Sequence, residues 1–368
     1  MKHICIDARM YGPNNTGIGR YVQNLLCSLT DQPNFHNYRF TLLVNPQQYN
    51  TIKSELGEKY KYLTVNIPHY SLNEQIKLPF ILYRLHPDLV HFPHFNKPIF
   101  YFGKSVVTIH DLIKHYSKGK DTTTKNIFLY WPKYWLYIIL TKLVIEHNAI
   151  IVPTNYWRQH LLTHFQLKPQ NIITTYEAVD PSFLNSSQIT QKTENYLLYT
   201  GNLYPHKNIV VVLKALKKLP DISLKIISQP NIFLTRTKLL SKKLGVENQV
   251  EFLGFVNDND FKTLYHHALA YVFPSLMEGF GLPGLEAQAL GCPVICSHAS
   301  CLPEVYEDSA LYFQPNNSND LVSKIKQLKT SPSLRKEMIA KGFSQVKKYS
   351  WKSTAAQTLS YYEKNLIP

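Results

Sequence analysis

The segment Ser275–Ala287 combines a glycine loop, the start of a helix and two separated carboxylates, and it reads Ser-Leu-Met-Glu-Gly-Phe-Gly-Leu-Pro-Gly-Leu-Glu-Ala. The apolar run Ala268–Pro274 before it suits a buried strand. Gly279 and Gly281 allow a tight turn and a close approach of the backbone to a ligand. Pro283 suits the first position of a helix, where its missing N–H costs nothing. The order strand, glycine loop, helix is typical of a site that binds a phosphorylated ligand.

Two kinds of hydrogen-bonding group in this segment suit a sugar nucleotide. The amides around Gly281, Leu282 and Gly284 would face outward at the positive end of the helix dipole, where a diphosphate binds. Glu278 on the loop and Glu286 in the first helical turn would accept hydrogen bonds from sugar and ribose hydroxyls. Taken one at a time, these residues also suit an ordinary turn and a helix start, so the prediction rests on their combination.

A lysine follows the predicted strand Tyr196–Thr200, where the chain turns through a glycine into a helix expected over Lys207–Leu219. A lysine near a helix N-terminus is locally unfavourable, so Lys207 predicts a compensating anion, for which the diphosphate is the natural candidate. The alternative is a solvated lysine.

The spacing Glu-x7-Glu of Glu278 and Glu286 resembles the signature of glycosyltransferase family 4, a large group of retaining enzymes that use nucleotide sugars. The resemblance implies an α/β fold of the GT-B type, with two Rossmann-like parallel-sheet domains facing each other across a cleft. It implies no metal or other cofactor, because Lys207 and the helix amides would neutralise the diphosphate. The catalytic residues that it implies are His110, Asp111, Lys207 and Glu278. The donor-binding residues that it implies are Gly17, Asn202, His206, Lys207, Gly254, Phe255, Val256, Glu278, Gly279, Phe280, Gly281, Leu282 and Glu286.

The sequence departs from the family pattern at the partner of the lysine. The family has an arginine either just after the strand glycine or directly before the lysine, and these places hold Asn202 and His206. Two alternatives follow. Lys207 acts with neutral donors, or His206 contributes when protonated, in which case donor affinity would fall as the pH rises.

His110 and Asp111 stand at the end of the apolar run Val106–His110, where residues of an α/β sheet tend to be functional. By resemblance, His110 would contact the transferred sugar and Asp111 would organise the acceptor pocket. The alternative is an aspartate that caps the next helix beside a structural histidine. The run Phe92–Phe95, at another strand end, is a further acceptor-side candidate.

Near the N-terminus, Thr16–Tyr21 opens a helix with Gly-x-Gly, which resembles the glycine loop by which the family's first domain approaches the donor phosphates. This resemblance puts Gly17 among the donor residues, whereas Arg20 also suits a surface position. Together with Ile6–Arg9, this segment looks like bacterial mannosyltransferases of surface polysaccharide assembly. The resemblance makes GDP-mannose the first expected donor.

A strand is predicted over Val250–Phe255, and the segment Phe252–Val256 resembles the strand whose backbone reads the base in this family. The next segment, Asn257–Asp260, contains Asp-x-Asp, a pair that holds a metal in a different glycosyltransferase fold. Because these aspartates directly precede the helix expected over Phe261–Ala268, we interpret them as helix caps.

A chain of 368 residues exceeds the usual size of one core, and strand-like runs alternate with helical ones throughout. We expect an acceptor-binding domain over residues 1–185, a nucleotide-sugar domain over 186–350, and a C-terminal helix, 351–368, that crosses back to the first domain. The polar stretch Asn185–Asn195 is the expected linker. The further strands expected are His3–Asp7, Arg39–Val44, Leu63–Ile67, Leu89–Phe92, Ala149–Val152, Leu224–Ile227, Ala270–Phe273, Val294–Cys296 and Ala310–Phe313.

The composition favours anionic partners, since 40 Lys and Arg against 25 Asp and Glu give a formal charge of +15. Nucleotide diphosphates, phospholipid surfaces and nucleic acid all satisfy this charge, but no recognised RNA- or DNA-binding motif is present, and we expect no nucleic-acid partner. The start Met1–Asp7 reads as a strand and not as a signal peptide, so a cytoplasmic location is expected.

Cysteines suggest neither disulfides nor a metal site. Cys5 and Cys27 fall in an apolar strand and an apolar helix, where buried thiols are common. The group Cys292, Cys296, His298 and Cys301 lacks the spacing of a common zinc site, and no metal is expected there.

The segment Asn126–Ile145 is strongly aromatic and apolar, but Pro132, Lys133 and Lys142 make it a poor membrane span. Tyrosines and tryptophans mixed with lysines suit a membrane interface, and four lysines (Lys114, Lys118, Lys120 and Lys125) precede it. Peripheral contact with the cytoplasmic membrane through residues 114–145 and a core helix with buried aromatics are the two alternatives.

The function that these features predict is retaining transfer of a hexose from a nucleotide diphosphate sugar to a carbohydrate or lipid-linked glycan acceptor in cell-surface polysaccharide synthesis. One alternative is a GT-B nucleotide-sugar epimerase, which would consume donor without an acceptor. A basic nucleic-acid-binding protein without enzymatic activity is another.

Overall fold

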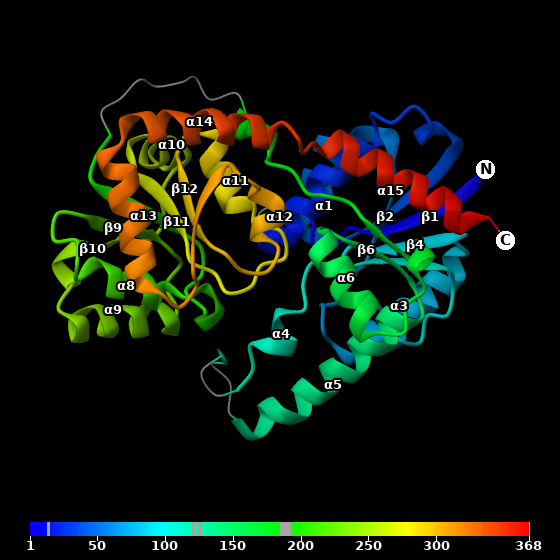
Figure 1. The fold of residues 1–368 in the computed structure, drawn as a ribbon. Coiled ribbons are helices and arrows are strands. Elements are labelled where there is room, and N and C mark those ends of the chain that lie inside the picture. The colour runs from blue at the N-terminus through cyan, green and yellow to red at the C-terminus, as the bar shows by residue number, and fades with distance from the viewer. Residues whose placement is uncertain (13–14, 120–121, 124–126, 185–192, 368) are drawn as a thin grey trace. The chain divides into compact units, whose positions relative to one another are not determined.

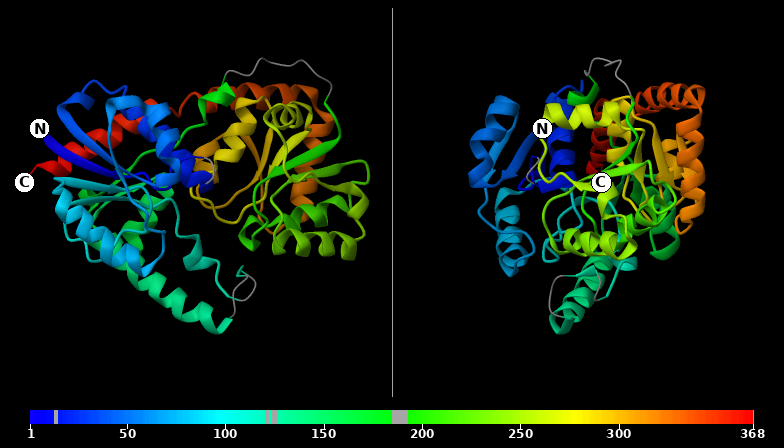
Figure 2. Two further views of the ribbon diagram at one scale, coloured as in Figure 1. Left: turned by 180° about the vertical axis from the view of Figure 1, so that it is seen from behind. Right: turned by 90° about the vertical axis from the view of Figure 1, so that its left-hand side faces the viewer.

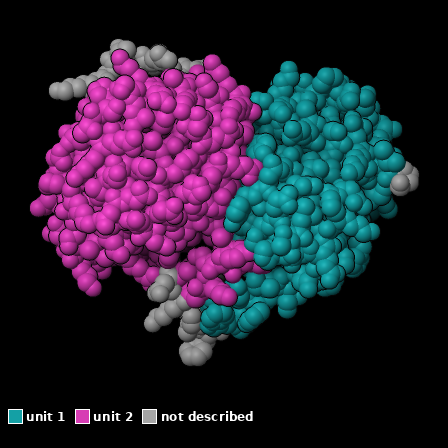
Figure 3. Space-filling view, viewed as in Figure 1, with its two compact units in different colours: residues 1–112, 128–177, 350–368 teal, residues 113–127, 178–349 magenta. Residues whose placement is uncertain are grey.

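The computed structural model of the chain describes residues 1–12, 15–119, 122–123, 127–184 and 193–367. The chain divides into two compact units, coloured separately in Figure 3. Unit 1 comprises residues 1–112, 128–177 and 350–368, and unit 2 comprises residues 113–127 and 178–349. Most of the predicted linker, residues 185–192, lies outside the described residues.

Unit 1 contains a seven-stranded sheet in the order β3-β2-β1-β4-β5-β6-β7 (Figure 1), in which all neighbouring strands are parallel. The central strands are continuous apolar runs because helices cover both faces of such a sheet. The strands are β1 (Lys2–Asp7), β2 (Tyr38–Val44), β3 (Lys61–Thr64), β4 (Leu89–Phe92), β5 (Ser105–Thr108), β6 (Ala149–Val152) and β7 (Ile172–Thr174).

The last helix of the chain completes the core of unit 1. Helix α15 packs against α1 and β4, and Trp351 and Tyr362 are buried there. The hydroxyl of Tyr362 hydrogen-bonds Nδ1 of the buried His91 at 2.6 Å. The main helices of the unit are α1 (Thr16–Leu29), α2 (Tyr49–Leu56), α3 (Leu72–Leu85), α5 (Ile127–Glu146), α6 (Asn155–His164) and α15 (Trp351–Leu366).

Unit 2 contains a six-stranded parallel sheet in the order β10-β9-β8-β11-β12-β13. The strands are β8 (Tyr196–Thr200), β9 (Ser223–Ile227), β10 (Val250–Phe252), β11 (Ala270–Phe273), β12 (Val294–Ser297) and β13 (Ala310–Phe313). Helices α8, α9 and α13 pack together as one layer, and α11 packs on α14 (Figures 1 and 2). The helices are α4 (Ile113–Tyr116), α7 (Pro181–Leu184), α8 (Ile209–Leu216), α9 (Ile232–Leu244), α10 (Asp258–His267), α11 (Leu282–Ala289), α12 (Leu302–Tyr306), α13 (Ser318–Thr330) and α14 (Pro332–Val346).

Both sheets share the doubly wound order in which the chain starts in the middle, moves to one edge and then returns to build the other side. The order reverses between β1 and β4 in unit 1 and between β8 and β11 in unit 2. Ligands of such sheets bind outside the carboxyl ends of the strands at this reversal. The prediction of two Rossmann-like parallel-sheet domains is confirmed, and each sheet offers one such place.

Several local predictions need correction. Strand β3 covers Lys61–Thr64 and not Leu63–Ile67, and β5 covers Ser105–Thr108 and not Val106–His110. A left-handed residue, Asn208 (φ 54°), separates α8 from the short 3-10 turn Pro205–Lys207, so no single helix covers Lys207–Leu219. Strand β10 stops at Phe252, three residues earlier than expected. Strand β7 was not predicted at all. Among the described helices, none is both long enough and apolar enough to cross a membrane.

Candidate active site

The reversal point of unit 2 brings a lysine and a glutamate together from the two strands that flank it. Lys207 follows β8 and Glu278 follows β11. Lys207 Nζ donates to both carboxylate oxygens of Glu278, at 2.7 and 2.8 Å. The lysine side chain is 22% exposed and the glutamate side chain 9%. A bidentate ion pair thus stands at the edge of the sheet where a phosphorylated ligand is expected.

The loop after Glu278 needs glycine at two places. Gly281, the residue before α11, has φ 114°, a left-handed conformation that side chains rarely adopt. A Cβ atom on Gly284 would lie 2.3 Å from the hydroxyl oxygen of Tyr306, and this hydroxyl donates to the Gly281 carbonyl. The two glycines therefore let the start of α11 sit directly on the Tyr306 ring.

The start of α11 is only partly as expected. The Gly284 amide donates to the Gly281 carbonyl at 3.3 Å, so it is not a free donor. Among the described residues, no side chain caps this helix, and its dipole end stays available to an anion. Glu286 is the fifth residue of α11 and not in its first turn, and it is 4% exposed.

Two neighbouring residues fix the backbone of the Glu278 loop. The Glu278 amide donates to the Ser300 hydroxyl at 3.1 Å. The buried Cys301 thiol contacts the carbonyl oxygens of Glu278 and Phe280 at 3.2 and 3.4 Å. Ser300 adopts φ 47°, a left-handed conformation that costs energy in a residue other than glycine and is typical of functional loops. Ser300 and Cys301 therefore fix the backbone position of Glu278 without any ligand.

The residues in the places of the family arginine are neutral. Burial and the charge of Lys207 lower the pKa of His206 to about 4. His206 is therefore uncharged near neutral pH in the structure without a donor, which favours the alternative in which Lys207 acts with neutral donors. The His206 carbonyl accepts from the Leu276 amide at 2.7 Å, which ties the lysine turn to the Glu278 loop. Asn202 is exposed on the turn after Gly201.

The predicted base-reading residues lie on the loop after β10. Gly254 has φ 66°, and the Phe255 ring is 94% exposed. With Leu253 and Val256, Phe255 lines an open pocket that reaches to α10. Strand β10 lies two strands from β8, a separation of about 10 Å at the usual spacing of strands in a sheet.

The Asp-x-Asp pair belongs to the start of α10. The cap of this helix is Asn257, whose side chain accepts from the Asp260 amide at 3.0 Å, so the aspartates are not the caps that we expected. Asp260 accepts in return from Nδ2 of Asn257 at 2.7 Å. This reciprocal pair occupies the Asp260 carboxylate in a capping role.

In unit 1, His110 is held at both ring nitrogens. Nδ1 lies 2.9 Å from Oε1 of Glu177, and Nε2 lies 3.0 Å from the Pro93 carbonyl. Burial lowers the pKa of His110, but the hydrogen bond and charge of Glu177, the Pro93 carbonyl and Asp111 outweigh it, so the pKa is raised. The ring also meets Tyr21 edge to face, with centroids 4.7 Å apart. A sugar could therefore reach the imidazole nitrogens only by displacing Glu177 or Pro93.

Glu177 was missed from the sequence because the strand before it, β7, is only three residues long. Asp111 follows His110 and is half-buried.

At the start of α1, the position that requires a glycine is Gly19 and not the predicted donor residue Gly17. A Cβ on Gly19 would meet the Gly12 carbonyl at 1.9 Å, whereas one on Gly17 would meet nothing within 4 Å.

The cysteines do not form a cluster of exposed thiols. Cys292, Cys296 and Cys301 are buried, and burial raises the pKa of each thiol. Cys27 is exposed, so its predicted burial was wrong.

Two models of known enzyme families together match most of the chain. The model of Glycosyltransferase Family 4 matches residues 15–183, and that of Glycosyl transferases group 1 matches residues 183–345. The molecule is thus a glycosyltransferase of the GT-B fold. It belongs to the glycosyltransferase family 4 group that these two models together describe.

Two relatives in the comparison are O-antigen mannosyltransferases. O-antigen chain mannosyltransferase B of Escherichia coli is 28% identical over 386 residues, covering 95% of this chain and 96% of the relative. O-antigen chain mannosyltransferase RfbU of Salmonella typhimurium is 29% identical over 61% of each chain. Among solved structures, sucrose-phosphate synthase from Thermosynechococcus elongatus superposes with a TM-score of 0.77 at 18% identity, covering 99% of both chains. The resemblance to bacterial mannosyltransferases of surface polysaccharide assembly is confirmed.

Proposed function

We propose that the protein transfers mannose, with retention of anomeric configuration, from GDP-mannose to a glycan acceptor in cell-surface polysaccharide synthesis. The observation that carries the proposal is the Lys207–Glu278 ion pair at the reversal point of the unit 2 sheet. The mannose assignment is supported by the two O-antigen mannosyltransferases among the relatives. Retention is inferred from the Glu-x7-Glu spacing of Glu278 and Glu286.

Charge neutralisation supports a reaction that needs no metal. The leaving diphosphate would accept hydrogen bonds from Lys207 and from the start of α11, two positive groups aimed at the place where negative charge develops. When Lys207 turns to the phosphates, Glu278 is released and its carboxylate can accept from sugar hydroxyls. Glu286, buried one turn into α11, would accept from the ribose. Phe255, with its ring almost fully exposed, offers a face on which a nucleobase can stack.

The acceptor side is assigned to unit 1, where we propose that His110 and Asp111 support the transfer step. Since Glu177 and Pro93 occupy both His110 nitrogens, the imidazole would act as a fixed positive group rather than as a proton carrier. The raised pKa of His110 supports this role.

The decisive experiment offers the protein a panel of nucleotide sugars with lipid-linked and free glycan acceptors, with and without EDTA. We expect the protein to use one donor and transfer to be undiminished by EDTA. The anomeric configuration of the transferred sugar in the product, measured by NMR, should match its configuration in the donor. The variant Glu286→Gln should lose donor binding, whereas Glu337→Gln on the exposed face of α14 should not. Conversion of donor without acceptor would instead indicate an epimerase, and a loss of transfer in EDTA would contradict the metal-free reaction.

We further propose that unit 1 contacts the membrane surface through α5. Four apolar side chains spaced four residues apart are 40–59% exposed along this helix: Trp131, Trp135, Ile139 and Leu143. The opposite face packs inward through Thr141, Val144 and Ile145, so the alternative in which all aromatics are in the core is wrong for the two tryptophans. Exposed Lys133 and Lys142 suit anionic lipid headgroups. Of the four preceding lysines, Lys120 and Lys125 lie outside the described residues.

A further inference from the structure

The His110–Glu177 pair of unit 1 is linked to the C-terminal helix α15 through an aromatic side chain. Tyr21, a buried residue of α1, meets the imidazole of His110 edge to face, with centroids 4.7 Å apart. The same tyrosine ring meets Trp351, the first residue of α15, with centroids 5.8 Å apart. These residues all belong to unit 1. The Tyr21 ring therefore connects the histidine to α15.

The hydroxyl group of Tyr21 is connected to α15 as well, through buried polar side chains. It lies 3.3 Å from Oγ1 of Thr108, and this oxygen lies 2.9 Å from Nε2 of His91. The Tyr362 hydroxyl, on α15, lies 2.6 Å from Nδ1 of the same imidazole. Burial and the charge of His110 lower the pKa of His91 to about 3, so this ring is neutral near pH 7, with one nitrogen that donates and one that accepts. Hydrogen bonds thus fix Tyr21 at its hydroxyl, in addition to the contacts of its ring.

A further contact from α15 fixes the backbone beside Glu177. Strand β7 ends at Thr174, so sheet pairing stops before the glutamate. Thr354 of α15 is buried, and its Oγ1 donates to the Tyr176 carbonyl at 2.5 Å. This carbonyl belongs to the planar peptide group that also contains the Glu177 amide. Helix α15 therefore holds the peptide directly before the glutamate.

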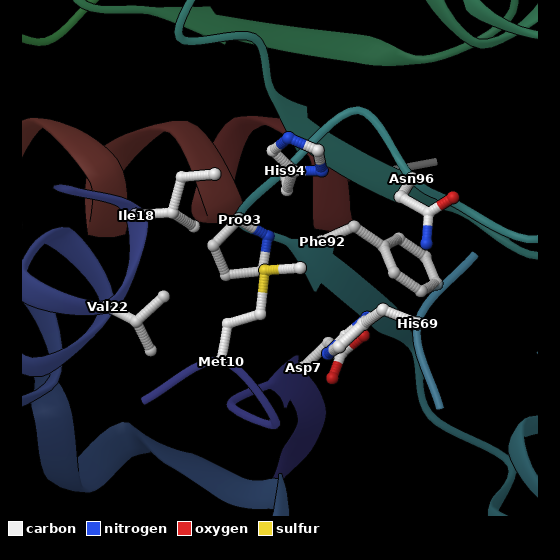
Figure 4. Close-up of a pocket in the computed structure, with 9 residues that line it drawn as sticks. All are labelled: Asp7, Met10, Ile18, Val22, His69, Phe92, Pro93, His94 and Asn96. Atoms are coloured by element: carbon white, nitrogen blue, oxygen red, sulfur yellow. The ribbon is translucent and has the colours of Figure 1, made fainter. Parts of the chain in front are cut away.

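The remaining support of the imidazole comes from β4. The Pro93 carbonyl lies 3.0 Å from Nε2 of His110, and Pro93 directly follows this strand. Pro93 lines a small cavity together with Met10 and Ile18 (Figure 4). The cavity has a volume of about 10 Å³, room for about one water molecule, so it leaves Pro93 little space in which to move. The contacts from α15 thus act on the Nδ1 side of the ring and on its plane.

The charge of His110 depends on where the Glu177 carboxylate lies. The Glu177 carboxylate and the Pro93 carbonyl only accept, so both hydrogen bonds form together only when each ring nitrogen carries a proton. Burial lowers the pKa of His110, and Glu177 raises it more than Pro93 or Asp111 does. A movement of this carboxylate away from Nδ1 would therefore lower the pKa of the histidine.

We propose that α15 positions the His110–Glu177 pair for the transfer step, with Thr354 and Tyr21 as the positioning residues. Thr354 sets the place of Glu177, and Tyr21 sets the plane of the imidazole. A charge that stabilises a transition state has to be oriented before the reaction, and a displacement of about 1 Å can lower the rate about 100-fold. This inference rests on the proposed role of His110 as a fixed positive group.

The test compares Thr354→Val with Thr358→Val, the same substitution about one turn further along α15. Thr358 is also buried, but its hydroxyl has no hydrogen-bond partner among the described residues. The pKa of His110 is followed by NMR of protein with isotope-labelled histidine, and its signal is assigned by its absence from His110→Gln. We expect Thr354→Val to lower this pKa by about 1 and the kcat of transfer roughly 10-fold, with little change in KM for the nucleotide sugar. Thr358→Val should match the parent, and Thr354→Ser, which keeps the hydroxyl, should restore both values.

The role of Tyr21 is tested by a second pair of variants. Tyr21→Phe keeps the ring that contacts His110 and loses only the hydroxyl, whereas Tyr21→Leu loses both. We expect kcat to fall roughly 10-fold in Tyr21→Leu and less in Tyr21→Phe, again with little change in KM for the nucleotide sugar. Urea unfolding followed by tryptophan fluorescence shows that each variant keeps a folded unit 1.

Equal changes in Thr354→Val and Thr358→Val, or an unchanged pKa of His110 in Thr354→Val, would overturn the inference. A His110→Gln variant that transfers as the parent does would also overturn it, because the pair would then have no part in transfer. The titration needs neither donor nor acceptor, so its result is independent of the proposed function. If the parent transferred from no donor, the proposed function would fail, while the titration would still show whether α15 positions the pair.

Discussion

The side chains of Lys207 and Glu278 hold each other in a geometry that the proposed donor would have to rearrange. The pair is bidentate and largely removed from solvent, with Nζ 2.7 and 2.8 Å from the two oxygens. In the proposed donor site, binding of a diphosphate would exchange one anionic partner of the lysine for another, and the carboxylate would be freed in the same step. The ion pair keeps both groups oriented while the site is empty.

Replacing Lys207 by methionine tests this exchange. We expect Lys207→Met to weaken binding of the nucleoside diphosphate roughly 10- to 100-fold, since charge-assisted hydrogen bonds contribute about 1.5–3 kcal/mol. The measurement is isothermal titration calorimetry with GDP. Lys214→Met, an exposed lysine on α8, is the matched control and should bind as the parent does. A Lys207→Met variant with unchanged affinity would remove the lysine from the donor site.

At the level of elements, apolar strands of four or more residues could be predicted, whereas the two three-residue strands were missed or given wrong bounds. Strands such as β4, β6, β8, β11 and β13 have the bounds read from the sequence, because a strand buried on both faces is a continuous apolar run. Strand β7 has only Ile172–Thr174, too few residues for a pattern. Glu177 follows this strand, so the partner of His110 was missed with it.

Contacts between residues that lie far apart in the chain could not be predicted from the sequence either. Nothing near Glu278 in the sequence identifies Ser300 or Cys301 as its supports, because their approach depends on how β12 pairs with β11. Likewise, the close contact that requires a glycine at position 284 comes from Tyr306 on another helix. The motif could be recognised from its spacing, but the geometry that holds it could not.

The proposed membrane contact of α5 can be tested by substituting its exposed apolar residues. Replacing Trp135 and Ile139 together by serine should reduce partition onto vesicles containing anionic lipid roughly 10- to 100-fold, because two large apolar side chains that are more than half exposed would no longer enter the interface. Cosedimentation with vesicles measures this. Leu239→Ser, an equally exposed apolar residue on α9 of unit 2, is the control and should leave partition unchanged. Equal loss in both variants, or in neither, would argue against a membrane role for α5.

For the molecule as a whole, acid should destabilise unit 1 through a buried histidine. Burial and the charge of His110 lower the pKa of His91 to about 3, against an ordinary value of 6.5. Between these values the unfolded chain binds more protons than the folded one, so this contribution to stability is complete above pH 6.5 and is lost as the pH falls toward 3. His110, whose pKa is raised, has the opposite sign and loses its contribution as the pH rises.

The expected result is a fall in the free energy of unfolding of about 1.4 kcal/mol per pH unit from His91 between pH 6 and pH 4. All four tryptophans, Trp131, Trp135, Trp157 and Trp351, belong to unit 1, so urea unfolding followed by tryptophan fluorescence reports on this unit. In His91→Gln the slope should be smaller by that amount. An unchanged slope would show that His91 does not titrate on unfolding.

The place of α15 in unit 1 has a consequence during protein synthesis. The seven-stranded sheet is complete once residue 174 has emerged, but Trp351 and Tyr362, which fill its core beside α1 and His91, are translated only after all of unit 2. At about 5–20 residues per second, the nascent unit 1 waits on the order of 10–40 s for its last helix. During this interval the apolar surface that α15 later covers is open to chaperones, and unit 2 can finish folding before the unit that precedes it in the chain.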